Sequence, residues 1–261
     1  MRFLRCIATA ILMYTRIPVP GFELSDDDMK NCIMFLPLTG VFIGAVIFAL
    51  IRFLPAHGVP IIAVAMLAVV VPLLITGGFH VDGFMDTVDA LSSYKDREQK
   101  LKILKDPHIG AFAVTGLATA GLIMIASFVV ILNIEAEDSF PVILTVCSVF
   151  VISRALTVLT CVLMKKAKAE GMLAAETSGS RRAAVVASVI WLMTVLIPDL
   201  LLDPLCTAVT VAAFAVFMLY YRHMAYRDFG GVTGDTAGYF ITAGEVVSVF
   251  AIAVFEVILH A

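Results

Sequence analysis

The stretch IIAVAMLAVVVPLLITGGFHVDGFMDTVDALSSY, residues 61–94, joins a long apolar run to a segment that carries three aspartates. Its first half has the length and composition of a membrane-spanning helix, which needs roughly 17 to 25 apolar residues. Its second half places Asp82, Asp86 and Asp89 four and three residues apart. At about 100° per residue, those steps leave the three carboxylates on one stripe of a helix. The sequence therefore predicts a transmembrane helix that leads into an acidic helical face at the membrane edge.

The composition places the whole chain in the membrane. Hydrophobic residues make up 61% of the sequence and charged residues 15%, and the mean hydropathy is +1.01, which is far outside the range of soluble proteins. We expect an all-α, polytopic integral membrane bundle of about seven transmembrane helices, forming a single domain over residues 1–261. The predicted spans are residues 31–54, 59–79, 109–134, 140–164, 183–202, 204–221 and 238–259. Only Asp203 separates the fifth span from the sixth, and Pro198 and Pro204 are also compatible with a turn or a broken helix there.

The basic residues predict an orientation. All but two of the 18 Lys and Arg residues, Arg52 and Arg154, fall on one side of the predicted membrane. Because basic short loops stay cytoplasmic, we expect a multi-pass protein of the cell inner membrane with its N-terminus and active-site loops in the cytoplasm. Residues 3–14 are apolar but too short to span, and basic residues flank them, so we expect a retained interfacial helix. We expect no nucleic-acid partner, although the net charge of −3 itself says nothing about one because it hides the basic face. The five cysteines show no metal or redox spacing, so we expect buried thiols.

The three aspartates predict a Mg²⁺ site. Like charges repel at this spacing, so the arrangement is costly unless a cation lies among them. Helix capping could explain one of these residues, but it does not explain three on one stripe beside Gly83, which permits close approach of a ligand or backbone. His80 could hydrogen-bond a phosphate, act as a base, or simply lie at the interface.

A polar segment, residues 80–108, is predicted to form a cytoplasmic catalytic loop. Its charged part, YKDREQKLKILKDPHIGAF (residues 94–112), predicts an amphipathic interfacial helix whose Lys and Arg side chains face water. Lys105 and Asp106 precede Pro107 and Gly110, which predict a turn where the chain re-enters the membrane. A phosphate or metal contact at this turn and a purely structural role are equally compatible with the pattern.

A second polar cluster, FGGVTGDTAGYF (residues 229–240), precedes the last span. A helix N-terminus in a glycine-rich loop suits phosphate, which makes Thr233 and Gly234 candidate ligands. Asp235 could be a helix N-cap or a further metal ligand. Arg154 and Glu245 lie within predicted spans, where charges are rare and often functional, although the two could also simply pair with each other.

Five segments in order carry a resemblance to a known family. They are TGGFHVDGFMDTVDALSSY, LKILKDPHIGAF, SRAL (residues 153–156), a lysine-rich stretch that leads to GSRRA (residues 179–183), and GGVTGDTAG. Together they resemble the cobalamin synthase, or adenosylcobinamide-GDP ribazoletransferase, family over nearly the whole chain. The HxDGxxDxxDA and KDxxIGAF pair at this separation is specific, whereas TGD alone would be weak.

The resemblance implies a Mg²⁺-dependent membrane enzyme that assembles the nucleotide loop of vitamin B12. Its substrates would be adenosylcobinamide-GDP and α-ribazole or α-ribazole 5′-phosphate, and its products adenosylcobalamin or its 5′-phosphate and GMP. Other enzymes of nucleotide-loop assembly are possible partners. The candidate catalytic residues are His80, Asp82, Asp86 and Asp89, and the candidate metal ligands are the three aspartates with Asp235. The candidate substrate-binding residues are Lys105, Asp106, Arg154, Arg181, Arg182, Thr233 and Gly234.

Two departures from the family pattern and two alternative functions bear on this interpretation. Val81 stands where many members have Glu, so one acid of the stripe is missing, and Lys165, Lys166 and Lys168 occupy a stretch where Arg is frequent. A CDP-alcohol phosphotransferase would also use membrane-edge aspartates, but its DGxxAR signature is absent after Asp82. A cation-coupled transporter would also bury acids, but these acids cluster at one edge and no inverted repeat is evident.

Overall fold

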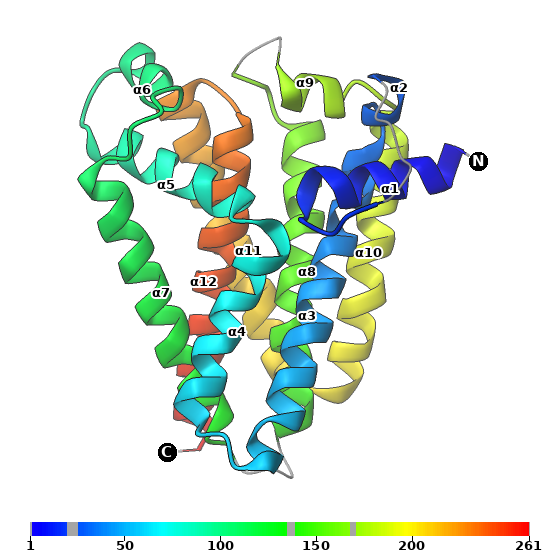
Figure 1. Ribbon diagram of the computed structural model, residues 1–261, viewed down its shortest axis with the longest axis vertical. Helices are drawn as coiled ribbons and strands as arrows, with labels where there is room; N and C mark the ends of the chain where they lie inside the picture. Colours follow the sequence, from blue (N-terminus) through cyan, green and yellow to red (C-terminus); the bar gives the residue numbers. More distant parts are fainter. Residues whose placement is uncertain (1, 20–25, 135–138, 168–170, 261) are drawn as a thin grey trace.

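The computed structural model describes residues 2–19, 26–134, 139–167 and 171–260 as an assembly of helices. The long helices run nearly parallel to one another and form one bundle (Figure 1). In chain order the helices are α1 (Arg2–Tyr14), α2 (Asp26–Met29), η1 (Cys32–Phe35), α3 (Leu36–Phe53), η2 (Pro55–His57), α4 (Ile61–Thr76), α5 (Phe79–Ser92), α6 (Arg97–Ile103), α7 (Ala111–Leu132), α8 (Ser139–Leu163), α9 (Met172–Glu176), α10 (Arg181–Leu202), α11 (Pro204–Met224), η3 (Ala225–Phe229) and α12 (Gly234–Leu259).

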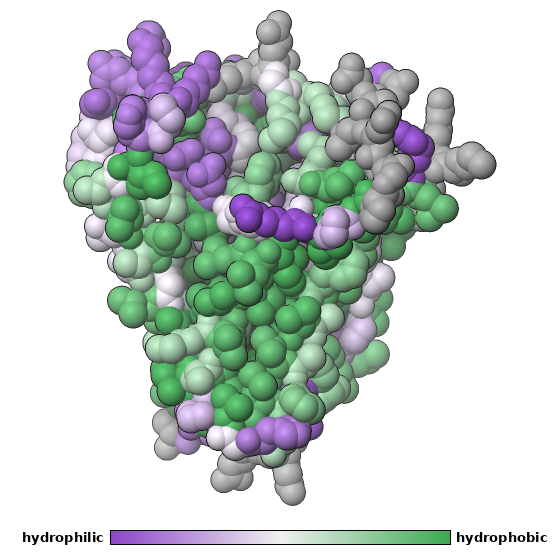
Figure 2. All heavy atoms as spheres, in the orientation of Figure 1, coloured by the Kyte–Doolittle hydropathy of each residue, from purple (hydrophilic) through white to green (hydrophobic). Residues whose placement is uncertain are grey.

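The predicted all-α membrane bundle is confirmed. In the described parts of the chain, six helical segments are long and apolar enough to cross a membrane, and the bent pair α4 and α5 raises this number to as many as seven. Apolar side chains form a broad band across the face seen in Figure 2, with hydrophilic residues gathered toward its two ends. The protein is therefore a multi-pass membrane protein.

Helix α8 is the centre of the bundle. Of the most apolar 18 residues of α8, 83% are buried inside the protein, against 22% for α7 and 11% for α10. Helices α7 and α10 therefore present most of their surface outward, where their apolar side chains suit lipid. The two chain ends lie at opposite ends of the bundle (Figure 1), which agrees with an odd number of spans.

Two details refine the predicted spans. The predicted span over residues 59–79 ends earlier, since α4 stops at Thr76 and the chain then bends by 100° into α5. The uncertain fifth and sixth spans are two separate helices, α10 and α11. Asp203 lies between them, and its side chain accepts a hydrogen bond from the N–H of Cys206 at 2.9 Å, which caps α11.

The N-terminal helix α1 lies across the bundle, nearly perpendicular to its long helices (Figure 1), as expected for an interfacial helix. The N–H of Arg16, just beyond α1, donates to the carbonyl oxygen of Ile75 at 2.8 Å. This bond ties α1 to the last turn of α4, directly before the bend that leads into α5.

Candidate active site

Two consecutive glycines produce the bend that carries the aspartates across the end of the bundle. Gly77 and Gly78 have φ values of 65° and 80°, a left-handed conformation that side chains disfavour. A side chain at Gly77 would also overlap that of Arg16. These glycines end α4 and turn α5 nearly at right angles to it (Figure 1). The predicted helical stripe is confirmed, because Asp82, Asp86 and Asp89 all lie within α5.

A close helix crossing brings Asp235 to the stripe. A Cβ atom on Gly83 of α5 would lie 2.7 Å from the carbonyl oxygen of Asp235, and one on Gly238 of α12 would lie 2.7 Å from the carbonyl oxygen of His80. The two helices therefore touch through their backbones at this point, which only glycine allows. The crossing places the first turn of α12 against the acidic face of α5, as the proposed four-aspartate set requires.

The N-cap of α12 is Thr233, so the capping interpretation of Asp235 is wrong. The Thr233 hydroxyl accepts a hydrogen bond from the N–H of Thr236 at 3.1 Å, and the N–H of Thr233 donates to the Thr236 hydroxyl at 2.9 Å. This reciprocal capping box satisfies the start of the helix without Asp235. Gly234 next to the cap is exposed, and no atom lies within 4 Å of the place where its Cβ would be.

The KDPHIGAF segment returns to the other end of the stripe. The carboxylate of Asp89 lies so close to Gly110 that a Cβ atom at position 110 would overlap both carboxylate oxygens. Lys105 and Asp106 are exposed in the turn before it, where the Asp106 carboxylate accepts a hydrogen bond from the N–H of His108 at 3.0 Å. That bond lowers the pKa of Asp106. The HVDGFMDTVDA and KDPHIGAF motifs therefore meet at α5.

Mutual repulsion marks the aspartates as one electrostatic group. Partial burial, followed by the charges of Asp82, Asp235 and Asp89, raises the pKa of Asp86 from 3.8 to about 6. The four side chains are nevertheless not drawn tightly together. Among the described residues, the group whose three potential ligand atoms all lie within 4.8 Å of one another is not formed by these aspartates. It lies at the opposite end of the bundle. Neighbouring carboxylates repel one another here, and the space beside Gly234 is open. Both features suit a divalent cation that keeps some of its water ligands.

His80 lies beneath this group and is poorly suited to proton transfer. Its side chain is 5% exposed, and its Nε2 atom has no hydrogen-bond partner. Burial, helped by the positive charge of Arg154, holds the pKa of His80 well below its usual value. A neutral, weakly basic imidazole at this place favours a carboxylate as the proton acceptor.

Arg154 and Glu245 form the predicted pair. Arg154 Nη1 and Glu245 Oε1 are 2.5 Å apart, and both side chains are buried. Arg154 Nε also donates to the Thr39 hydroxyl at 3.0 Å, and the Ser153 hydroxyl donates to Glu245 Oε1 at 2.9 Å. This network joins α3, α8 and α12 directly below His80, so the structure supplies Arg154 with protein partners. Its proposed role in substrate binding stays a prediction.

The Lys and Arg side chains of α6 were expected to face water, and one of them does not. Lys100 does not face water, because it is 8% exposed and its Nζ lies 2.6 Å from Asp228 Oδ1 in η3. Lys102 is exposed as expected and pairs with Glu98 one turn earlier. The Lys100–Asp228 bridge anchors α6 against the loop before α12. Residue spacing does not reveal this bridge, because Lys100 and Asp228 lie in segments far apart in the chain.

The remaining predicted contacts surround the start of α12 and α10. The backbone of residues 165–167 pairs with Val232, through Val232 N–H to the Lys165 oxygen at 2.9 Å and Ala167 N–H to the Val232 oxygen at 3.0 Å. Lys165 and Lys166 are thereby placed beside the glycine-rich loop, whereas Lys168 lies outside the described residues. Arg181 and Arg182 are exposed in the first turn of α10, which stands across the bundle from α5 (Figure 1).

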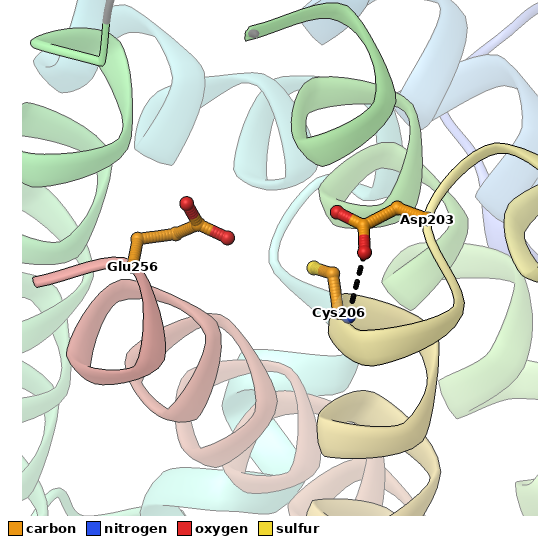
Figure 3. Close-up of side chains that lie close together, drawn as sticks. All are labelled: Asp203, Cys206 and Glu256. Atoms are coloured by element: carbon orange, nitrogen blue, oxygen red, sulfur yellow. Dashed lines mark hydrogen bonds between the residues drawn. The ribbon is translucent and has the colours of Figure 1, made fainter. Parts of the chain in front are cut away.

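The opposite end of the bundle holds a separate acidic cluster that the sequence spacing did not predict. Asp203, Cys206 and Glu256 each offer one potential ligand atom there, all within 4.8 Å of one another. Figure 3 shows the Glu256 carboxylate extending from α12 toward the start of α11. Glu256 is near the other end of α12 from Asp235, roughly 30 Å away at the helical rise of about 1.5 Å per residue. This cluster cannot take part in chemistry at the four aspartates.

Comparison with known proteins agrees with this arrangement of motifs. A family model described as cobalamin-5-phosphate synthase matches residues 6–253. The chain belongs to this family. It is 36% identical to the adenosylcobinamide-GDP ribazoletransferase of Lachnoclostridium phytofermentans, over 98% of this chain and 96% of that protein. It is also 30% identical to the enzyme of that name from Azorhizobium caulinodans, over 91% of this chain and 90% of that one. No solved structure matches the chain.

Membership of the cobalamin-5-phosphate synthase family favours neither alternative function. The match over residues 6–253 contains all five segments that carry the family resemblance. A CDP-alcohol phosphotransferase and a cation-coupled transporter therefore have no support from the comparisons. The individual roles of the site residues stay predictions.

Proposed function

We propose that the protein transfers the cobinamide phosphate moiety of adenosylcobinamide-GDP to α-ribazole or its 5′-phosphate, and that the reaction takes place at the face formed by Asp82, Asp86, Asp89 and Asp235. The names of the curated relatives supply the two substrates. The observation that carries the location is the double glycine contact, Gly83 with Asp235 and Gly110 with Asp89, which brings three separate motifs to one helix.

The reaction is a phosphoryl substitution. A ribose hydroxyl of the ribazole forms a new bond to the diphosphate phosphorus on the cobinamide side, and the bond between that phosphorus and the bridging oxygen of GMP breaks. GMP leaves with the bonding electrons, and the hydroxyl proton passes to a protein carboxylate and then to water. Such a transfer depends mainly on in-line positioning and charge neutralisation, not on covalent catalysis by the protein.

The aspartates would hold Mg²⁺, which fits their repulsion and open approach. When bound, Mg²⁺ supplies charge neutralisation for the diphosphate and its leaving group. Asp86 or Asp89 accepts the proton in our proposal, because the buried neutral His80 is a weak base.

The other charged groups of this end have positioning roles. In our proposal Lys105 and Asp106 contact a phosphate, which their exposure in the turn before Gly110 supports. Gly234 leaves backbone at the start of α12 open to an anion. We also place this end of the bundle in the cytoplasm, on the strength of its basic residues. Association with other enzymes of nucleotide-loop assembly stays a prediction.

The test measures GMP release by the purified protein in lipid nanodiscs. We expect release from adenosylcobinamide-GDP only when both α-ribazole 5′-phosphate and Mg²⁺ are present, and its loss in Asp82→Asn. A matched control is Asp96→Asn, which changes an acid at the start of α6 whose side chain only caps that helix. Folded wild-type protein that releases no GMP with both additions would refute the proposed reaction.

A further inference from the structure

A cavity of about 240 Å³ reaches Asp235, one of the four aspartates. His80, Gly234 and Asp235 line one part of it, and Glu176 and Met172 of α9 line another. It is smaller than the roughly 300 to 1,000 Å³ of sites that enclose a whole drug-sized ligand. The cavity therefore has room for one part of a substrate that continues toward the aspartates.

The lining of the cavity is mostly apolar. Side chains from η1, α3, α9 and α12 supply much of its wall, including Ile33, Leu36, Leu173, Ala237 and Ile241. Such a wall favours a flat, apolar ring system over a charged or heavily hydroxylated group. The bulky corrin of adenosylcobinamide-GDP does not fit a space of this size.

Glu176 is an unexplained acid in this wall. It is 5% exposed, and its Oε1 atom has no hydrogen-bond partner. Leaving a buried polar atom unpaired is costly, so a partner for this atom is expected. Burial raises the pKa of Glu176 from 4.5 to about 7, so a substantial share of the carboxyl groups carries a proton near neutral pH. A protonated carboxyl group is a hydrogen-bond donor.

We propose that this cavity binds the heteroaromatic base of the ribazole substrate and that Glu176 donates a hydrogen bond to its free ring nitrogen. This inference rests on the proposed function. The base is a dimethyl-substituted benzimidazole, which is flat and apolar. It has one ring nitrogen that is not bonded to the sugar and that can only accept a hydrogen bond. The apolar wall matches the first property. The Oε1 atom of Glu176 matches the second, because it has no partner even though the carboxyl group also interacts with the hydroxyl of Tyr14.

Guanine, the other base among the substrates, matches the cavity less well. Its edge carries several donors and acceptors, each of which needs a partner once buried. The cavity offers few polar groups, and some already have protein partners. The Thr233 hydroxyl caps α12, and Lys166 Nζ is hydrogen-bonded to the Thr177 hydroxyl. An apolar base leaves fewer atoms unsatisfied.

The orientation of the bound ribazole follows from the two parts of the wall. With the base against Glu176, the attached ribose extends toward Gly234 and Asp235, the part of the wall that belongs to the aspartate face. The attacking hydroxyl then meets the diphosphate at the carboxylates. Glu176 acts here as a specificity-determining residue for the acceptor and takes no part in the chemical step.

The test is a double-mutant cycle between Glu176 and the ring nitrogen. The acceptors are α-ribazole and an analogue in which a C–H group replaces that nitrogen, and the proteins are wild type, Glu176→Leu and Glu176→Gln. We expect the Leu variant to raise KM for α-ribazole about tenfold, the value of one hydrogen bond. KM for adenosylcobinamide-GDP and kcat should stay within twofold. Gln should restore most of the affinity, since its amide also donates.

The analogue supplies the decisive comparison. Wild type should discriminate against it about tenfold, whereas Glu176→Leu should bind both acceptors equally. Equal discrimination by both proteins would overturn the proposal, and a raised KM for adenosylcobinamide-GDP would instead assign the cavity to guanine. Glu98→Leu on α6, whose partner Lys102 is exposed, is the matched control and should leave both KM values unchanged.

Direct binding separates this inference from the reaction itself. Calorimetry with α-ribazole alone requires no donor and no turnover. If wild type released no GMP but bound α-ribazole in a manner sensitive to Glu176→Leu, the proposed reaction would fail and the cavity assignment would stand. If GMP were released normally and binding ignored Glu176, only the cavity assignment would fail.

Discussion

The carboxylate of Asp89 occupies the space that a side chain at Gly110 would fill. Asp89 ends the acidic stripe of α5, and Gly110 ends the turn that leads into α7. The contact explains why the two motifs occur together in one chain. Any residue larger than glycine at position 110 would displace the carboxylate of Asp89, the third aspartate of the stripe. It also makes position 110 a sensitive test of the site.

Gly110→Ala should abolish most activity and leave the fold intact. The added methyl group must displace the Asp89 carboxylate, and a misplacement of about 1 Å at a reaction centre can cost on the order of a hundredfold in rate. The measurement is GMP release, with thermal stability in detergent as the check on folding. Gly121→Ala in the same helix α7 is the matched control, because nothing lies within 4 Å of its new methyl group. Full activity of Gly110→Ala would show that Asp89 is not needed where the structure places it.

Gly83→Ala should separate α5 from α12. Its Cβ would lie 2.7 Å from the Asp235 carbonyl oxygen, a contact with backbone that a rotamer change cannot relieve. Overpacking of this kind typically costs 1 to 3 kcal/mol, so we expect a lower unfolding temperature together with a loss of activity. Gly78→Ala, which meets no atom within 4 Å but has a φ of 80°, should lower the stability with a smaller effect on kcat. A Gly83→Ala protein as active as wild type would contradict the proposed participation of Asp235.

The sequence predicted the membrane bundle and the stripe because both follow from local periodicity. Apolar runs of spanning length and aspartates at helical spacing need no knowledge of distant contacts. The 100° bend at Gly77 and Gly78 was not predicted, although consecutive glycines after an apolar run are a signal for a turn. That bend turns the acidic helix across the end of the bundle.

Contacts between distant segments were beyond the sequence. The spacing of residues does not reveal that Lys100 meets Asp228, or that Glu176 faces a cavity lined by Asp235. Arg154 and Glu245 were an exception, since two isolated charges inside apolar spans have few other possible partners. In this fold close glycine contacts, hidden from a single sequence, bring the separate motifs together.

Asp86→Asn should stabilise the metal-free protein while it removes activity. Burial and the charges of its neighbours raise the pKa of Asp86 above its ordinary value, so ionisation at high pH destabilises the fold. Asparagine cannot ionise. After a discount for solvent screening of this half-exposed group, we expect a gain of about 1 kcal/mol in chelator at pH 8. The gain should shrink as the pH falls from 6 and vanish only below the unfolded pKa of 3.8, where the aspartate is protonated in both states. Thermal unfolding across this range is the measurement, and Mg²⁺ should stabilise wild type more than the variant.

The Arg154–Glu245 pair distinguishes a structural charge from a substrate ligand. Removing one partner leaves an uncompensated buried charge, so Glu245→Leu should destabilise the protein by about 3 to 5 kcal/mol. Replacing both residues with apolar ones, Arg154→Met with Glu245→Leu, should recover much of that loss. If Arg154 serves only the fold, the refolded double variant keeps its KM for adenosylcobinamide-GDP, because no cation at this depth meets the donor. A stable double variant with that KM raised tenfold or more would assign Arg154 to substrate binding, as the sequence first indicated. Steady-state kinetics beside unfolding curves in the same detergent would separate the two outcomes.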